Sequence, residues 1–130
     1  MNGINVVAAL LAAMSSFLLG GAWYSLFFAK QWQKLTGLKD EELRAGTGKV
    51  FAGAFVLSLV MAFNLAAFIG KNQSVSFGAF AGFAAGFGWV AMSLGINYLF
   101  ERKPIGLFLI NGGYNVVALT TMGIIVGAMH

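Results

Sequence analysis

Four stretches of the chain contain no Asp, Glu, Lys or Arg: residues 1–29, 50–70, 72–100 and 104–130. Each is longer than the roughly 20 residues that a helix needs to cross about 30 Å of hydrocarbon. Lipid offers no hydrogen-bond partner to an open strand edge, so such spans are expected to be helices. Only 9% of the residues are charged, against about 25% in soluble domains. The sequence therefore predicts an all-α integral membrane protein.

The predicted architecture is one transmembrane domain, residues 1–130, with four transmembrane helices in a bundle. The helices are placed at about residues 4–28, 49–70, 75–99 and 104–128, and residues 30–48 form the one long polar loop. A cleaved signal peptide is a competing interpretation of the first stretch. Signal peptides begin with a basic segment, and this stretch contains no Lys or Arg.

Aromatic and basic residues indicate the orientation of these helices. The segment WYSLFFAKQW, residues 23–32, places two tryptophans and a tyrosine where apolar sequence gives way to the first lysine. Such rings prefer the lipid headgroup level, so the segment marks the membrane exit of the first helix. Lys71 is the only basic residue on one predicted side, and the other side has Lys30, Lys34, Lys39, Arg44, Lys49, Arg102 and Lys103. By the positive-inside rule, residues 30–48 are cytoplasmic and both termini face outward.

The predicted helix at 75–99 has one face of small residues. At 3.6 residues per turn, six side chains fall within roughly 100° of one another: Gly78, Gly82, Gly86, Trp89, Ser93 and Asn97. Glycines four residues apart allow a neighbouring backbone to approach closely, so Gly78, Gly82 and Gly86 are predicted to pack against another helix. The opposite face, with Phe80, Phe83, Phe87 and Leu94, is expected to meet lipid or a second copy in a homodimer.

A candidate binding site lies on the predicted cytoplasmic half of the spans. Asn111 and Asn115 are one turn apart on the fourth helix, and Asn97 lies at a similar depth on the third. Polar groups in hydrocarbon must find partners, so these amides either join the helices or line a pocket. The candidate binding residues are Trp23, Trp89, Ser93, Asn97, Asn111, Tyr114 and Asn115.

Catalytic chemistry has little support in this sequence. The charge-free stretches offer no general acid or base, the one histidine is His130, and there is no cysteine. We therefore predict no catalytic residue, no metal site, no cofactor and no enzymatic activity. The segment GTGK is not a phosphate-binding loop, because that motif requires Gly at position 43 and Ser or Thr at position 50, where Leu43 and Val50 stand. Eight dispersed basic residues do not predict nucleic-acid binding.

Two octapeptides suggest an internal repeat. SFLLGGAW at 16–23 and GFAAGFGW at 82–89 share a small residue, Phe, Gly and Trp at matching positions. A tandem repeat of two helical hairpins would explain the match. A chain rich in Gly, Ala and Phe also produces such matches by chance, so both explanations remain open.

Two segments resemble a known family. GGAWYSLFFAKQW, residues 20–32, and LFERKPIGLFLINGGYNVVALTTMG, residues 99–123, are similar to the signature regions of the domain of unknown function 1761 family. The resemblance implies a small, mostly bacterial membrane protein with four helices and no established activity. Leu26 stands where the family often has Pro, and Asn115 stands where it often has His. Any proton or metal chemistry of that His is therefore not expected here.

Two functions follow from these observations. The favoured one is a non-enzymatic component of a bacterial inner membrane that binds a partner or lipid, with its amides as structural links. The alternative is a small oligomeric transporter or channel for a neutral or weakly polar solute. The two differ in geometry, because only the second requires a water-sized cavity that reaches Asn111 and Asn115 from the cytoplasmic side.

Overall fold

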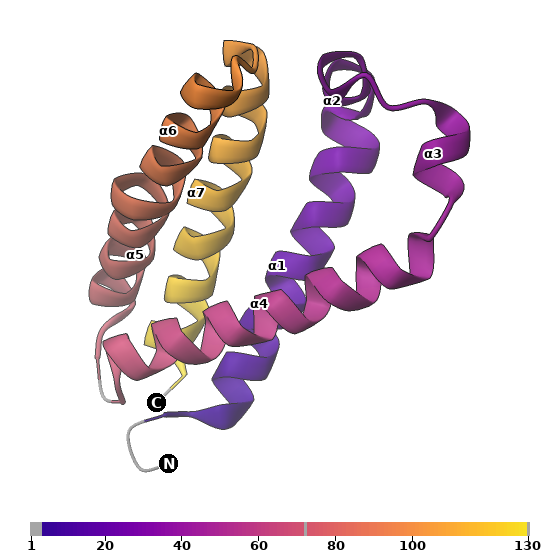
Figure 1. The fold of residues 1–130 in the computed structure, drawn as a ribbon. Coiled ribbons are helices and arrows are strands. Elements are labelled where there is room, and N and C mark those ends of the chain that lie inside the picture. Colours follow the sequence, from indigo (N-terminus) through magenta and orange to yellow (C-terminus); the bar gives the residue numbers. More distant parts are fainter. Residues whose placement is uncertain (1–3, 72, 130) are drawn as a thin grey trace.

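The computed structural model describes residues 4–71 and 73–129, and every element in these two ranges is a helix (Figure 1). The α-helices are α1 (Val6–Ala22), α2 (Ala29–Thr36), α3 (Asp40–Arg44), α4 (Thr47–Ile69), α5 (Val75–Phe83), α6 (Met92–Glu101) and α7 (Ile105–Ala128). Two π-helical segments, η1 (Trp23–Phe27) and η2 (Ala84–Ala91), continue α1 and join α5 to α6. The predicted all-α fold is confirmed.

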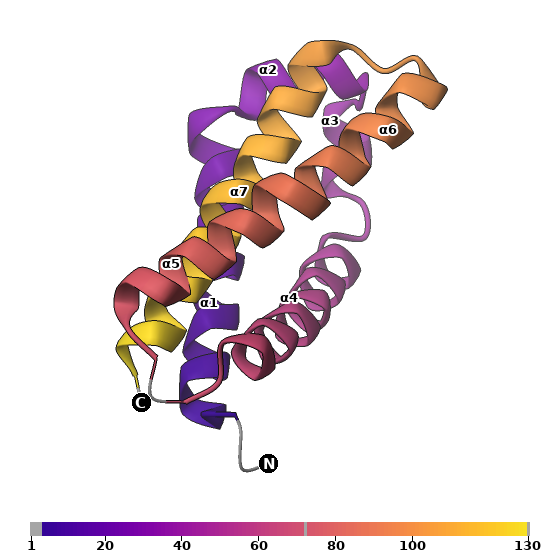
Figure 2. The same ribbon diagram turned by 90° about the vertical axis from the view of Figure 1, so that its left-hand side faces the viewer.

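Four of the continuous helices are long and apolar enough to cross a membrane, as the charge-free stretches predict. They are Val6–Phe27, Thr47–Ile69, Val75–Glu101 and Ile105–Ala128. The two ends of the described chain lie close together, and Asn5 Nδ2 donates a hydrogen bond to the carbonyl of Met129 at 2.9 Å. The turn between α4 and α5 lies at this same end of the bundle, and α2 and α3 lie at the other (Figures 1 and 2). We call the second end the loop side.

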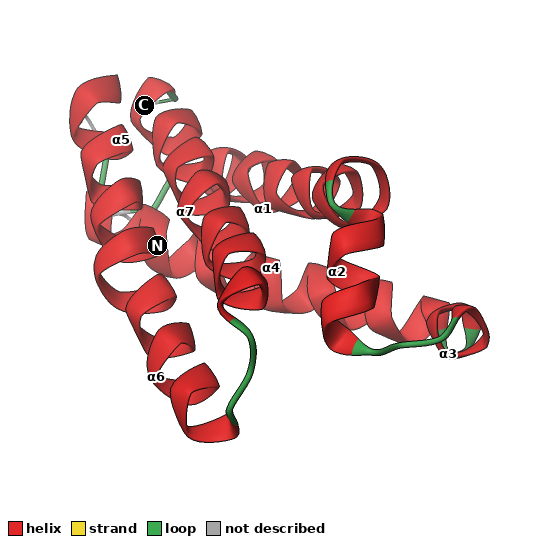
Figure 3. Ribbon diagram, turned by 90° about the horizontal axis from the view of Figure 1, so that it is seen from above, coloured by secondary structure: helices red, strands yellow, loops and turns green. Residues whose placement is uncertain are grey.

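The polar loop is partly helical. After η1 the backbone leaves helical geometry at Phe28, with φ −125° and ψ 19°. Helix α2 then runs steeply away from α1 (Figure 3). It ends at Gly37, whose φ of 76° is a left-handed conformation that favours glycine. Because the chain changes direction at Phe28 and at Gly37, α2 and α3 lie at the loop side of the bundle and do not extend the axis of α1.

Helices α5 and α7 pack with almost no space between their backbones. A Cβ atom on Gly78 would overlap the carbonyl oxygen of Gly123, and a Cβ on Gly82 would overlap that of Leu119. A Cβ on Gly86 would lie 2.9 Å from the Cα of Val116. Only glycine permits this approach, so the three glycines of the predicted small face lie against α7. The sequence analysis did not single out Gly123, whose own Cβ would overlap the carbonyl of Gly78.

The opposite end of the bundle from the loop side has a dense core of small side chains. Ala8, Ala9, Ala12 and Ala13 of α1 are fully buried, and they belong to one cluster with Met122 and other residues of α4 and α7. Alanine lets three helices approach closely, as glycine does in the α5–α7 pair. No comparable cluster of buried apolar residues is present among the described residues of the loop side.

Helix α4 diverges from α6 and α7 toward the loop side. It packs on α1, where Phe17 makes edge contacts with Phe51 and Phe55 at centroid distances of 6.0 and 5.7 Å. Figure 1 shows α4 lying close to α5 near the termini and crossing away from α6 and α7 toward α3. The helices are therefore tightly packed near the termini and splayed near the loops.

The two octapeptides of the suggested repeat both adjoin π-helical geometry. Residues 16–23 lead into η1, and residues 82–89 overlap η2. The hairpin duplication itself stays a prediction.

Candidate functional site

Asn111 joins three helices through its side chain. Its Oδ1 accepts a hydrogen bond from Tyr24 Oη at 2.5 Å, and its Nδ2 donates to Tyr98 Oη at 2.8 Å. Tyr24 belongs to η1 and Tyr98 to α6, so one amide on α7 links the first and third spans. Both sides of this amide are engaged, which makes Asn111 a structural link.

Tyr114 and Trp23 form a second pair of aromatic residues, and the ring of Tyr114 packs against Gly20. Tyr114 Oη lies 2.9 Å from the carbonyl of Ser16, to which it donates, and a Cβ on Gly20 would lie 3.2 Å from this hydroxyl. Trp23 Nε1 donates to the carbonyl of Ile110 at 2.9 Å. Glycine on one helix therefore makes room for a ring from its neighbour, and the ring's polar atom satisfies a backbone group in the apolar interior.

A cavity of about 750 Å³ lies beside these residues, between α1, α4, α6 and α7. It extends from Leu38 and Leu43 in the segment that connects α2 to α4, down to Ser58 and Asn115. Ser58 is the middle residue of α4, so the cavity reaches the middle of this span. We call it the loop-side cavity.

Asn115 is the amide best placed to contact a molecule in the loop-side cavity. Its Nδ2 donates to the carbonyl of Asn111 at 2.9 Å, one turn back on α7. No described residue donates a hydrogen bond to its Oδ1, although the side chain is half-buried and lines the cavity. Asn115 therefore offers its Oδ1 as a free hydrogen-bond acceptor, whereas Oδ1 of Asn111 already accepts a hydrogen bond from Tyr24.

Aromatic rings form much of the cavity wall. Tyr24 lies between Trp32 and Tyr114, with edge contacts at centroid distances of 5.3 and 5.5 Å. Phe17 and Phe51 close the side formed by α1 and α4. Glu42 of α3 is the one charged side chain among the described residues that line the cavity.

The predicted meeting of Asn97 with Asn111 and Asn115 is wrong. Asn97 and Ser93 are exposed, and neither lines the cavity. The cause is η2, because a π-helix bonds i to i+5 and so adds a residue to the turn. From the last residue of η2 onward, the residues that face α7 are Ala91, Gly95 and Tyr98, with Gly95 beside the ring of Phe108. A uniform 3.6-residue wheel cannot anticipate this shift.

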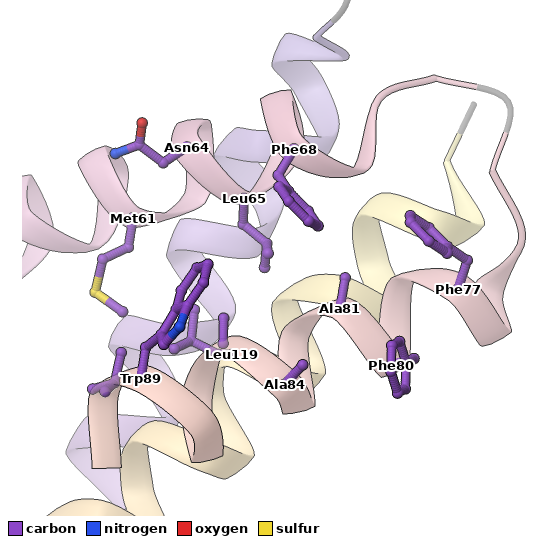
Figure 4. Close-up of a pocket in the computed structure, with 12 residues that line it drawn as sticks. Met61, Asn64, Leu65, Phe68, Phe77, Phe80, Ala81, Ala84, Trp89 and Leu119 are labelled. Carbon is purple, nitrogen blue, oxygen red and sulfur yellow. The ribbon is translucent and has the colours of Figure 1, made fainter. Parts of the chain in front are cut away.

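Trp89 leaves the small face for the same reason and lies in a different depression. It is 72% exposed and, with Met61, Leu65 and Phe68 of α4, lines an apolar groove of about 590 Å³ between α4 and the α5–η2 segment. Figure 4 shows its indole standing between the two helices, close to Leu65. Asn64 lies at the edge of this groove, with its amide directed away from Trp89 (Figure 4).

Of the seven predicted binding residues, the structure brings Asn111, Tyr114 and Asn115 to the cavity. Trp23 contributes a structural hydrogen bond beside it. Tyr24 and Tyr98 are not among the predicted binding residues, although all three tyrosines of the chain line this cavity. The position of Tyr24 beside Trp23, in the aromatic segment that marks the membrane exit, is the one sequence signal that points to it.

The site offers hydrogen-bonding and ring surfaces. Among the described residues there is no group of three or more His, Asp or Glu side chains that could hold a metal ion.

A family sequence model described as "Protein of unknown function (DUF1761)" matches residues 7–127. The chain belongs to this family. The match includes every residue named above as lining the cavity, and it confirms the resemblance seen in the two signature regions. No curated protein and no solved structure matches the chain.

Proposed function

We propose that this member of the DUF1761 family is a non-enzymatic membrane protein that binds a small solute in the loop-side cavity. The observation that carries the proposal is the reach of the cavity, which connects the α2–α4 segment to Asn115 and to Ser58 at the middle of α4. A volume of about 750 Å³ falls within the roughly 300–1,000 Å³ of small-molecule sites. This geometry favours solute binding over the interpretation in which the asparagine amides serve only to link the helices.

The two ends of the bundle support entry from one side only. The loop-side end is hollow, whereas the other end is filled by the buried alanines of α1 and by Met122. A solute can therefore reach Asn115 from the loop side without a helix movement. Release to the opposite side would require α1 to separate from α4 and α7, which is the motion that a transport cycle would need.

The distribution of charge supports a cytoplasmic position for the cavity mouth. Seven of the eight Lys and Arg residues lie between the start of α2 and the start of α4 or in the α6–α7 turn, and Lys71 lies at the other end. Under the positive-inside rule the loop side faces the cytoplasm of a bacterial inner membrane, and both termini face outward.

The experiment exploits the absence of cysteine from the chain. Ser58→Cys, Ser16→Cys and Ser93→Cys each introduce one thiol into a membrane span. A neutral, water-soluble methanethiosulfonate reacts with thiolate, which forms only where water is present. Ser58 and Ser16 are both buried, at 6% and 2% exposure, but only Ser58 lines the cavity. We therefore expect Ser58→Cys to be modified faster than Ser16→Cys. Ser93→Cys, on the outer face of α6, should also react slowly.

The proposal fails if Ser58→Cys is as unreactive as Ser16→Cys in the folded protein, because a cavity without water cannot exchange a dissolved solute. Equal reactivity of all three thiols would instead indicate loose packing, and it would also contradict the proposal. Mass spectrometry of the intact protein quantifies the modification.

A second candidate function, binding of lipid or of a partner, is supported by the apolar groove between α4 and the α5–η2 segment (Figure 4). Its wall contains Phe68, Phe77 and Trp89, and in a bilayer it would lie beside acyl chains. In a homodimer the same groove, which Phe80 also lines, would meet the second copy together with the neighbouring exposed ring of Phe83. This function would be favoured if the Ser58→Cys thiol proved unreactive and the groove held lipid or a second copy.

A further inference from the structure

We infer that the loop-side cavity selects small organic cations of the quaternary ammonium class. The inference rests on the proposed function, since it assumes that the cavity binds a solute. It replaces the neutral or weakly polar solute that the sequence suggests with a cation. Three independent features carry it: the charge of the lining, its rings and the partial negative charge of an amide oxygen.

The lining is acidic although the protein is basic. The chain has eight Lys and Arg residues against four Asp and Glu. Yet Glu42 is the only charged side chain among the described residues that line the cavity. Its Oε1 accepts the backbone N–H of Lys39 at 2.9 Å, which fixes the carboxylate beside the opening. Lys39 and Arg44 lie close to Glu42 and are also exposed, but neither of them lines the cavity, so Glu42 is the charged group that a molecule inside it contacts.

The rings come from all sides of the cavity. Six aromatic side chains line it, one from each of α1, η1, α2, α4, α6 and α7: Phe17, Tyr24, Trp32, Phe51, Tyr98 and Tyr114. Ring faces carry partial negative charge, so a cation within about 6 Å of a ring centroid is attracted. A quaternary ammonium suits such a wall because its charge is spread over methyl groups that also favour apolar contact.

The amide oxygen of the cavity contributes partial negative charge rather than a hydrogen bond, because a quaternary ammonium has no N–H with which to donate one. Asn115 Oδ1 receives no hydrogen bond from any described residue and is an acceptor at the base of the cavity. Tyr98 already accepts a hydrogen bond from Asn111, and Tyr24 already donates to it. An anion would meet Glu42, ring faces and an amide oxygen, with the neutral hydroxyl of Tyr98 as a donor and no basic side chain in the lining. A cation meets attractive groups at each of these positions.

The test compares a cation with its neutral isostere. Choline and 3,3-dimethylbutan-1-ol have nearly the same shape, but the quaternary nitrogen of the first is carbon in the second. Binding of each, and of benzyltrimethylammonium, is measured by equilibrium dialysis against the full chain in maltoside micelles, with protein-free micelles as the partition blank. We expect at least one of the two cations to bind, and the neutral alcohol to bind more weakly by on the order of ten-fold.

Two matched pairs of variants locate the effect. Glu42→Gln keeps the acceptor for the Lys39 N–H but removes the charge, and it should weaken cation binding several-fold while leaving binding of the alcohol unchanged. Glu101→Gln makes the same change at the exposed end of α6, outside the cavity lining, and should have no effect. Trp32→Leu should weaken cation binding, and Trp32→Phe, which keeps a ring, should restore most of it.

The outcomes separate this inference from the proposed function. Equal binding of choline and the alcohol would overturn the cation selectivity and leave a solute site in place. Binding that responds equally to Glu42→Gln and Glu101→Gln would assign the effect to general surface charge and overturn the inference. If neither cation binds, the inference is wrong, and the reactivity of Ser58→Cys still decides whether the cavity is a water-accessible site.

Discussion

The contact of α5 with α7 allows a quantitative prediction for Gly82→Ala. A Cβ at position 82 would overlap the carbonyl oxygen of Leu119 and lie 2.8 Å from its carbonyl carbon and 3.0 Å from the Cα of Thr120. Carbon atoms attract best at about 3.5–4.0 Å, so α5 would have to move away from α7 by about 1 Å. All three obstructing atoms belong to the backbone, which has no side-chain rotation that could relieve the overlap.

The free-energy cost follows from this displacement. Inserting a methyl group into a packed interior costs about 1–3 kcal/mol, and the upper end applies because the backbone obstructs it. The neighbouring contacts of Gly78 and Gly86 also lengthen, and a gap of 0.5–1 Å forfeits about a quarter to a half of each dispersion contact. Alanine regains up to about 1 kcal/mol from its higher helix propensity. The net loss of unfolding free energy for Gly82→Ala is therefore about 2 kcal/mol.

Gly53→Ala is the matched control. Gly53 lies within α4, and a Cβ there would meet nothing within 4 Å. Only the helix propensity changes, so this variant should be neutral or more stable by up to about 1 kcal/mol. Both variants are unfolded reversibly by SDS in mixed micelles, with helix content followed by circular dichroism. If Gly82→Ala is as stable as Gly53→Ala, then the close approach of α5 to α7 is not the packing of the folded protein.

Two further predictions concern the amides and the orientation. Asn111→Leu should lower the unfolding free energy by roughly 1–2 kcal/mol because it breaks the links to Tyr24 and Tyr98, whereas the same change at the exposed Asn97 should cost almost nothing. Equal effects in the SDS titration would contradict the hydrogen bonding described for Asn111. In intact cells, an impermeant maleimide should label Gln73→Cys but not Thr36→Cys, and the reverse pattern would invert the proposed topology.

The number and type of the spans could be read from the sequence. A stretch of more than 20 residues without charge has few stable environments other than a bilayer, and lipid leaves the backbone little choice but a helix. Gly78, Gly82 and Gly86 were also readable as a face, because they precede most of η2 and their spacing of four places them on one side of a regular helix. These features depend on local sequence and on the solvent.

The candidate site depended on geometry that no local pattern encodes. The extra residue of η2 turns Asn97 outward and Tyr98 inward, and whether a helix adopts a π-turn depends on how its two halves pack against a neighbour. The cavity itself exists because α4 packs on the alanines of α1 near the termini and diverges from α6 near the loops. Residue types determined which helices enter the membrane, whereas the angles between those helices decided which side chains share a space.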